Sequence, residues 1–374
     1  MSFFFVCNYL CFIAAGWSRI PIVVYIAWIE AVFAITAFLF SPLNTTTATD
    51  LARIFYELDL CRAGLGDNLY IEAPLSSLYL HLVAYMFSNN HFLPVISVIV
   101  SYTLCFLTLL KILKYFSIDN KSVKRFAISI LICGVVFFGI MNNIRYSMAM
   151  MFYWWIFYYD VIKHFKYAKL LYILAILLHP GTSMMVIVRV ISAMKTKYMF
   201  MIMSMIGAFF YFLQDEFFSF LVDLFPVDSV LRDMALGISV KALSYSISVM
   251  YDIPWTMKLA DAYLLFCLII CFILGKNYHI LLLKNKIIEN IIICMIILCL
   301  FGFTTNFMSG DFTGRIIVYS SVLNPLLMSD ILTKCKNNCQ QHYIYMKIFC
   351  LLLMLPYVSM YLFYFYDKWL YLGL

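Results

Sequence analysis

Arg145 is a charged residue between two long apolar stretches, in the segment "GIMNNIRYSMAMMFYWW". A charge so close to membrane segments is costly and needs a reason. A guanidinium stays charged at any working pH and presents five hydrogen-bond donors, which suits it to binding a phosphate group. Asn142 and Asn143 lie beside it and add neutral donors. The segment predicts an anion-binding site; the alternative is an arginine at a helix end that reaches toward the lipid headgroups.

Arg315 stands in a similar setting, at the start of the apolar run in "FTTNFMSGDFTGRIIVYSS". Gly310 and Gly314 precede it, and glycines let a backbone approach a ligand closely. Arg315 is therefore a second candidate for binding an anion. The alternative is a turn with an Asp311–Arg315 surface ion pair, which contributes little energy.

His179 interrupts an apolar run in "LAILLHPGTSMMVIV". At about 1.5 Å per helical residue, it lies roughly 14 Å from Lys169, near the middle of a bilayer. Pro180 disfavours helical geometry at His179, so one helix should end near Leu178 and Pro180 should open the next. Such a break is tolerated only inside protein or beside a cavity. We interpret His179 as a proton-exchanging imidazole in a wet cavity; the alternative is a kink whose histidine bonds a freed carbonyl.

Residues 41–74 form a polar, acidic segment whose start has helical character, with Thr49 or Asp50 as the candidate cap. One interpretation places Asp50, Arg53, Asp67 or Glu72 over a substrate at the membrane surface. The other is an interfacial amphipathic helix with solvated charges. Its apolar stripe against the membrane would consist of Ile54, Phe55 and Leu58.

Composition shows what surrounds these residues. Of 374 residues, 65% are hydrophobic and 12% charged, and the mean hydropathy is +0.94. Soluble domains are about 45–50% apolar and about 25% charged. Continuous apolar runs recur along the chain, which predicts an all-α polytopic integral membrane protein, with residues 1–374 forming a single membrane domain.

Neither charge nor cysteines suggest another class of protein. The net charge of +7 is explained by basic cytoplasmic loops and does not indicate nucleic acid binding. The twelve cysteines are scattered without a Cys-x-x-Cys pair, so we interpret them as apolar filler. Nucleotide-binding loops, zinc motifs and nucleophile elbows are absent from the sequence, and we expect neither a metal nor a cofactor.

We expect about 10–12 membrane-spanning helices from these runs. The candidate runs are 3–17, 22–40, 75–88, 92–113, 126–141, 146–162, 170–188, 198–213, 234–250, 259–275, 287–303, 316–333 and 346–366. Basic loops that follow Lys111, Lys163, Lys276 and Lys334 are assigned to the cytoplasm. The acidic segments 41–74 and 214–258 are then the two larger periplasmic loops.

Two segments conflict with this orientation. If 75–88 and 92–113 both crossed, the basic loop after Lys111 would lie outside, so 75–88 should be interfacial or re-entrant. Segment 170–197 either crosses once, which puts Arg189, Lys195 and Lys197 outside, or forms a broken hairpin that keeps them inside. With the hairpin, residues 214–258 form a single outer loop. Their acidity favours this arrangement.

"NNIRYSMA" at 142–149 and "LAILLHPGTSMMVIV" at 174–188 together resemble the EpsG-like, Wzy-type family of polysaccharide polymerases. The family pattern is Asn-x-x-Arg-Gln-x-x-Ala, a basic cytoplasmic turn, and Ala-x-x-x-His-x-Ser/Ala within a membrane segment. The residues in register are Asn142, Arg145, Ala149, Lys163, Lys166, Ala175, His179 and Ser183. Upstream, "TDLARIFY" and "IEAPLSSLYLHL" resemble the family's first outer loop. "GRIIVYSSVLNP" resembles its late Arg-x-x-x-Tyr element, with Arg315 and Tyr319.

The resemblance implies a glycosyltransferase of the bacterial inner membrane that extends O-antigen-like polysaccharide at the periplasmic face. A glycan on undecaprenyl diphosphate would be transferred to a second lipid-linked repeat unit, in a membrane shared with a chain-length regulator protein. The implied diphosphate-binding residues are Arg145 and Arg315. The implied proton acceptor is His179, with Asp50 or Glu72 as competing candidates. The implied substrate-binding residues are Asn142, Asn143, Arg53 and Tyr319.

Two other functions fit parts of the sequence. A GT-C-type glycosyltransferase using a polyprenyl-phosphate sugar would also have an outer-loop carboxylate, usually in a close acidic pair. Asp50 and Asp67 do not form such a pair. A lipid-linked oligosaccharide flippase predicts broken helices in matched halves, and the sequence has one clear break without a twin.

Overall fold

The computed structural model describes residues 2–40, 50–66, 69–135, 137–226, 229, 231–233, 235–236, 239, 255–304, 316–318 and 320–364. In this part of the chain the regular elements are helices, and no strand occurs. The all-α class is therefore confirmed.

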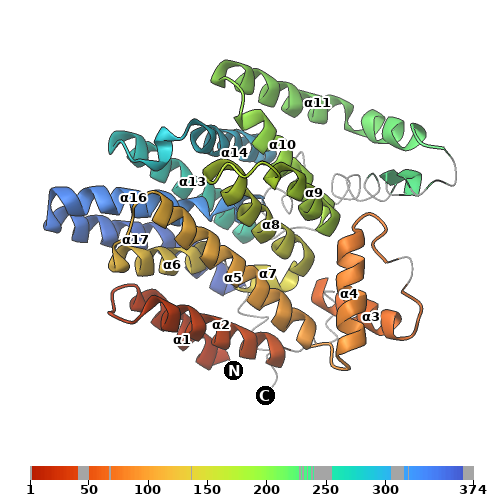
Figure 1. The fold of residues 1–374 in the computed structure, drawn as a ribbon, viewed down its shortest axis with the longest axis horizontal. Helices are drawn as coiled ribbons and strands as arrows, with labels where there is room; N and C mark the ends of the chain where they lie inside the picture. The colour runs from red at the N-terminus through yellow and green to blue at the C-terminus, as the bar shows by residue number, and fades with distance from the viewer. Residues whose placement is uncertain are drawn as a thin grey trace.

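Long helices packed side by side make up most of the structure (Figure 1). The α-helices are α1 (Ser2–Ala15), α2 (Ile22–Leu39), α3 (Asp50–Arg62), α4 (Pro74–Met86), α5 (Phe92–Tyr115), α6 (Lys121–Gly134), α7 (Phe137–Asn142), α8 (Ile144–Phe157), α9 (Ala168–Leu178), α10 (Ser183–Ser192), α11 (Thr196–Asp223), α13 (Trp255–Asn277), α14 (Lys286–Thr304), α16 (Leu323–Asn338) and α17 (Gln340–Tyr364). Shorter turns are the π-helical η1 (Tyr158–Ile162) and the 3₁₀ turns η2 (Pro180–Thr182) and η3 (Leu282–Lys284).

Five helices in the described ranges are long and apolar enough to cross a membrane. They are Ile22–Leu39, Phe92–Tyr115, Leu259–Asn277, Ile316–Asn338 and Gln340–Met360. Other predicted apolar runs consist of shorter helices. The predicted segment 126–141, for example, is divided between α6 and α7, and 146–162 between α8 and η1. Each of these helices is too short to cross a membrane by itself, but the two helices of a pair together approach the thickness of a bilayer.

Turns that carry basic residues lie together at one end of the helix bundle. Lys111 at the end of α5 donates to the Tyr159 hydroxyl of η1 at 3.0 Å. Asn290 in α14 donates to the Ser192 carbonyl at the end of α10 at 2.9 Å. The α1–α2 and α16–α17 turns lie at the same end, on the left of Figure 1. We call this the basic end. If the basic loops all face the cytoplasm, they must lie at one end of the bundle.

α3 and α4 lie at the opposite end, on the right of Figure 1. There the rings of Phe38 at the end of α2 and Phe92 at the start of α5 are 5.5 Å apart. Arg62 of α3 donates to the Phe87 carbonyl at 2.9 Å and to the Asn90 side chain, which fastens α3 to the α4–α5 turn. Because α2 ends where α5 begins, α4 does not run between the two ends. This agrees with the interfacial or re-entrant placement predicted for 75–88.

The predicted apolar stripe of α3 faces protein, not the membrane. Leu51, Ile54 and Leu58 are buried within the structure. Phe55 packs edge-on against the ring of His91, with centroids 5.3 Å apart. The prediction was wrong because a stripe at helical spacing indicates burial without saying what covers it.

The chain reverses between α9 and α10, whose two arms lie along the same stretch of α8–η1. The Tyr153 ring is 5.3 Å from that of Tyr172 in α9, and its hydroxyl donates to the Met185 carbonyl of α10 at 3.1 Å. The Asp160 carboxylate accepts from Tyr172 at 3.2 Å and from Arg189 of α10 at 2.7 Å. One straight helix would separate these partners by about 25 Å. Residues 170–197 therefore form the broken hairpin, and Arg189 lies toward the basic end.

Helices enter both ends of segment 214–258, which we predicted to be a loop. α11 continues to Asp223 and α13 begins at Trp255. The apolar run at 234–250 falls mostly outside the described residues. The predicted loop is therefore shorter than its acidic composition suggested.

Candidate functional site

The apex of the α9–α10 hairpin is formed by His179 and the η2 turn. α9 ends at Leu178, and His179 is extended, with φ −156° and ψ 119°. Pro180 is the first residue of η2. The helix end and the position of Pro180 are thus confirmed, for the predicted reason that a residue before proline avoids helical geometry.

Hydrogen bonds from within the protein reach the carbonyl and N–H groups that have no helical partner at the break. The Ser76 hydroxyl of α4 donates to the Leu178 carbonyl, and the Thr182 hydroxyl donates to the His179 carbonyl at 2.8 Å. The Gly181 N–H donates to Nδ1 of His179 at 3.0 Å. An irregular backbone at membrane depth needs such partners. The bond from Ser76 also brings the start of α4 to the apex.

The Gly181 bond defines which nitrogen of His179 carries the proton. Because Nδ1 accepts a hydrogen bond, a neutral ring carries its proton on Nε2. The second nitrogen of the neutral imidazole is then a hydrogen-bond donor and not a proton acceptor. This weighs against His179 as the base and favours a role in binding an anion.

Tyr146 connects the start of α8 to the apex. Its ring meets the His179 ring edge-on, with centroids 5.0 Å apart. A Cβ at Gly181 would lie 3.0 Å from His179 Nδ1 and 3.2 Å from the Tyr146 ring. The apex therefore has no room for a larger residue at position 181 without moving one of these rings.

Arg145, next to Tyr146, faces the turn between α3 and α4. Its guanidinium carbon lies 3.4 Å from the centre of the Tyr70 ring, a cation–π contact. Tyr70 has a left-handed backbone with φ 57°, which costs a bulky residue about 1–2 kcal/mol. Such strain persists where surrounding contacts require it, and here it accompanies the contact with Arg145.

Tyr70 also joins Arg145 to a buried carboxylate. Its hydroxyl donates to Glu57 of α3, which is 7% exposed, and Arg53 Nε lies 3.8 Å from that carboxylate. Burial raises the pKa of Tyr70 above its usual range, although the charges of Arg145 and Arg53 oppose the rise. The phenol therefore stays protonated and remains a donor to Glu57 near neutral pH.

The structure brings several predicted site residues to this region and leaves others undescribed. Arg145 precedes Tyr146 in the chain, and the Tyr146 ring contacts the His179 ring. Glu72 lies in the same turn as Tyr70. Asn143 is at the N-cap position of α8, without a side-chain capping bond. Arg53 is exposed beside Glu57. Arg315 and Tyr319 lie outside the described residues, as do the side chains of Asp50 and Asn142.

Sequence reasoning missed Glu57, Tyr70 and Tyr146 as members of this region. A signal for Glu57 was present, because it falls between Ile54 and Leu58 on the apolar stripe of α3. A carboxylate in such a stripe needs a partner when it is buried. Nothing in the local pattern indicated that Tyr70 would be this partner.

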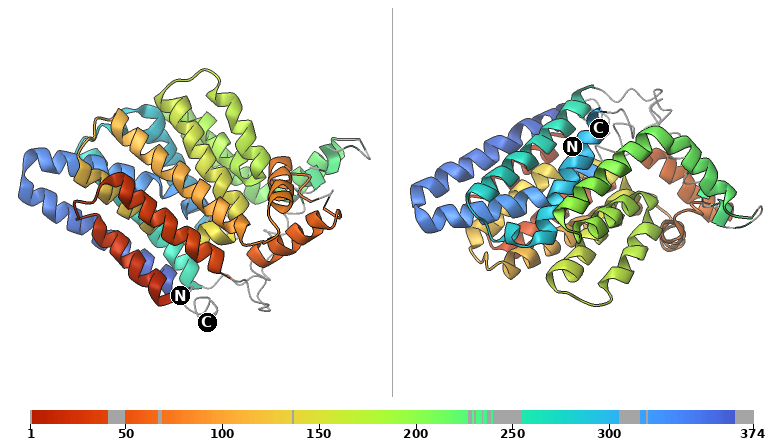
Figure 2. Two further views of the ribbon diagram at one scale, coloured as in Figure 1. Left: turned by 60° about the horizontal axis from the view of Figure 1, so that its bottom comes forward. Right: turned by 90° about the horizontal axis from the view of Figure 1, so that it is seen from above.

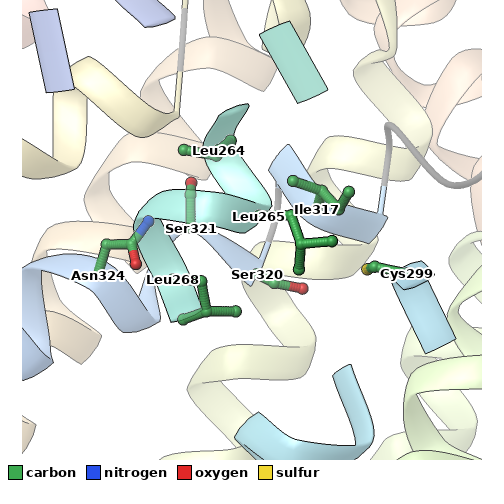
Figure 3. Close-up of a pocket in the computed structure, with 8 residues that line it drawn as sticks. All are labelled: Leu264, Leu265, Leu268, Cys299, Ile317, Ser320, Ser321 and Asn324. Atoms are coloured by element: carbon green, nitrogen blue, oxygen red, sulfur yellow. The ribbon is translucent and has the colours of Figure 1, made fainter. Parts of the chain in front are cut away.

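A separate small cavity lies between α13, α14 and α16 (Figure 3). It is lined by Leu264, Leu265, Leu268, Cys299, Ile317, Ser320, Ser321 and Asn324. Its volume is about 10 Å³, room for about one water molecule. Asn324 is fully buried, and its amide has no hydrogen-bond partner within the described ranges. The cavity is too small for a sugar or a phosphate, so it is not a candidate substrate site.

Comparisons with protein-family models, curated proteins and solved structures find no match to this chain. Over the residues that the structure describes, no group of three His, Cys, Asp or Glu side chains is placed to hold a metal ion. The functional interpretation therefore depends on the region around Arg145 and His179.

Proposed function

We propose that this protein is a polysaccharide polymerase of the bacterial inner membrane. It transfers a growing glycan from polyprenyl diphosphate to the sugar of a second lipid-linked repeat unit. The observation that carries the proposal is that the start of α8, which bears Arg145 and Tyr146, contacts the His179 apex through the Tyr146 ring. This contact lies toward the end of the bundle opposite the basic loops, where α3 and α4 are drawn in Figure 1. By the positive-inside rule, this end faces the periplasm.

The proposed chemistry is a single displacement at the anomeric carbon. A bond forms between the acceptor hydroxyl oxygen and that carbon, while the bond to the diphosphate oxygen breaks and its electron pair leaves with the diphosphate. Arg145 stabilises the negative charge that develops, together with Arg315. The Nε2–H of His179 donates to the same anion. The hydroxyl proton passes to a carboxylate of the α3–α4 region, for which Glu72 and Asp50 remain the candidates.

The glycan profile of a bacterial strain that lacks this gene tests the proposed function. A polymerase leaves its lipid-linked acceptor intact, so we expect single repeat units on the surface and a loss of long chains. The measurement is electrophoresis of extracted glycan beside the parent strain and a strain complemented with the wild-type gene. Loss of all surface glycan, including single units, would indicate a flippase and contradict the proposal.

A further inference from the structure

Arg125 and Lys347 are two buried cations at the basic end, outside the region described above. They are 8% and 4% exposed. Arg125 belongs to α6 and Lys347 to α17, and both reach the α1–α2 turn. Nη1 of Arg125 donates to the Ile20 carbonyl at 3.3 Å, and Nζ of Lys347 donates to the Gly16 carbonyl at 3.1 Å. Three separate segments thus enclose the two charges.

Among the residues that the structure describes, those that contact this pair are polar or aromatic and carry no opposite charge. Nζ of Lys347 lies 4.6 Å from the centre of the Trp17 ring and 5.0 Å from that of Phe126. Nε of Arg125 is buried without a hydrogen-bond partner in the described part of the chain. The two cations are also near enough for their charges to repel. One donor of Arg125 is therefore left unsatisfied by the described residues.

The carboxylates near the basic end are engaged elsewhere. Asp119 pairs with Lys124 at 2.9 Å, Glu289 with Lys286 at 2.8 Å and Asp160 with Arg189 at 2.7 Å. Asp330 accepts the Leu282 N–H at 2.7 Å. In the described ranges, neither Arg125 nor Lys347 forms a salt bridge. Buried charges are normally paired, so an anion from outside the chain fits this position.

We propose that Arg125 and Lys347 bind a phosphate group, supplied by an anionic lipid of the surrounding leaflet. Trp17 borders the pair and is 43% exposed, as expected of an aromatic residue at headgroup level. Basic pockets between membrane helices bind phosphate-bearing headgroups in this way. Free inorganic phosphate shares the chemistry and is the other source. The site is independent of the proposed polymerase activity.

Thermal unfolding of the purified full-length protein tests this site. In micelles containing phosphatidylcholine, added phosphatidylglycerol should raise the wild-type melting temperature by about 3 °C or more. The Arg125→Gln/Lys347→Gln variant should show no such rise. Without anionic lipid it should be at least as stable as the wild type, because the mutual repulsion is gone. The matched control is Lys166→Gln/Lys169→Gln, which removes two exposed charges from the same end and should respond like the wild type.

A rise that is equal in the wild type and the Arg125→Gln/Lys347→Gln variant would overturn the proposal. A rise produced by inorganic phosphate alone, and lost in that variant, would support the site and assign it to free phosphate. If the double variant does not fold, Lys347→Gln alone can be purified and its bound lipid measured by mass spectrometry. It should retain less phosphatidylglycerol per protein than the wild type, and an unchanged amount would overturn the proposal.

Discussion

Replacing Arg145 by alanine should abolish long-chain glycan while leaving the amount of protein in the membrane unchanged. Removing one donor that stabilises developing negative charge typically slows a reaction by roughly 10²–10³-fold. Arg145 also lies in the first turn of α8, where its side chain faces the Tyr70 ring and does not fill a core position. The loss should therefore appear in the reaction and not in the fold.

The variant Arg145→Lys separates charge from geometry. Lysine keeps the positive charge but lacks the planar fork that binds phosphate oxygens in pairs. We expect shortened chains, intermediate between the wild type and Arg145→Ala. The matched control is Arg19→Ala, which removes an exposed arginine from the basic end and should leave chain length unchanged. Glycan electrophoresis measures chain length, and an immunoblot measures the amount of protein in the membrane. Normal chain length in Arg145→Ala would refute the role of Arg145 in the reaction.

The second large effect is expected at the buried ion pair between Asp160 and Arg189. These side chains are 4% and 10% exposed and join η1 to α10. Removing one partner of a buried pair leaves an uncompensated charge and costs roughly 3–5 kcal/mol. Asp160→Ala should therefore lower the free energy of unfolding by about this amount, release α10 from η1 and so disturb the His179 apex.

Thermal unfolding in detergent measures this effect. Asp160→Leu/Arg189→Met removes both charges and should recover most of the lost stability, because an apolar pair can replace a buried ion pair at little cost. The control Asp119→Ala breaks an exposed pair, in which Asp119 is 72% exposed, and should change stability by less than about 1 kcal/mol. If Asp160→Ala matched this control, the pair would not hold the hairpin.

The helical class, five of the predicted spans and the break at His179 could be predicted because they follow from local rules. The expected count of about 10–12 spans is not shown, because in the described residues only five helices are long and apolar enough to cross a membrane. Apolar runs of bilayer length give helices, and proline ends a helix before itself. The basic loops were also predictable, since lysines and arginines were grouped in the sequence. The end of α5 and η1, which precede two of these loops, meet through Lys111 and Tyr159. Figures 1 and 2 show the α16–α17 turn, which belongs to a third, at the left of the bundle.

The tertiary details could not be predicted from such rules. The sequence left 170–197 as either one crossing or a hairpin, because both satisfy hydropathy; only the paired contacts of Asp160 to both arms decide. Residue type alone suggested His179 as the base. Whether the ring can accept a proton depends on which of its nitrogens accepts the hydrogen bond from the Gly181 N–H. The connection from Glu57 through Tyr70 to Arg145 joins residues far apart in the chain, and no local pattern encodes it.

The most direct test of the proposed function is reconstitution of the purified protein in liposomes with one lipid-diphosphate-linked repeat unit as the only substrate. The proposed reaction predicts dimers and longer glycans on lipid, with one polyprenyl diphosphate released for each new glycosidic bond. Arg145→Ala should release none. Movement of the intact lipid-linked unit across the bilayer, with no new bond and no released diphosphate, would contradict the account.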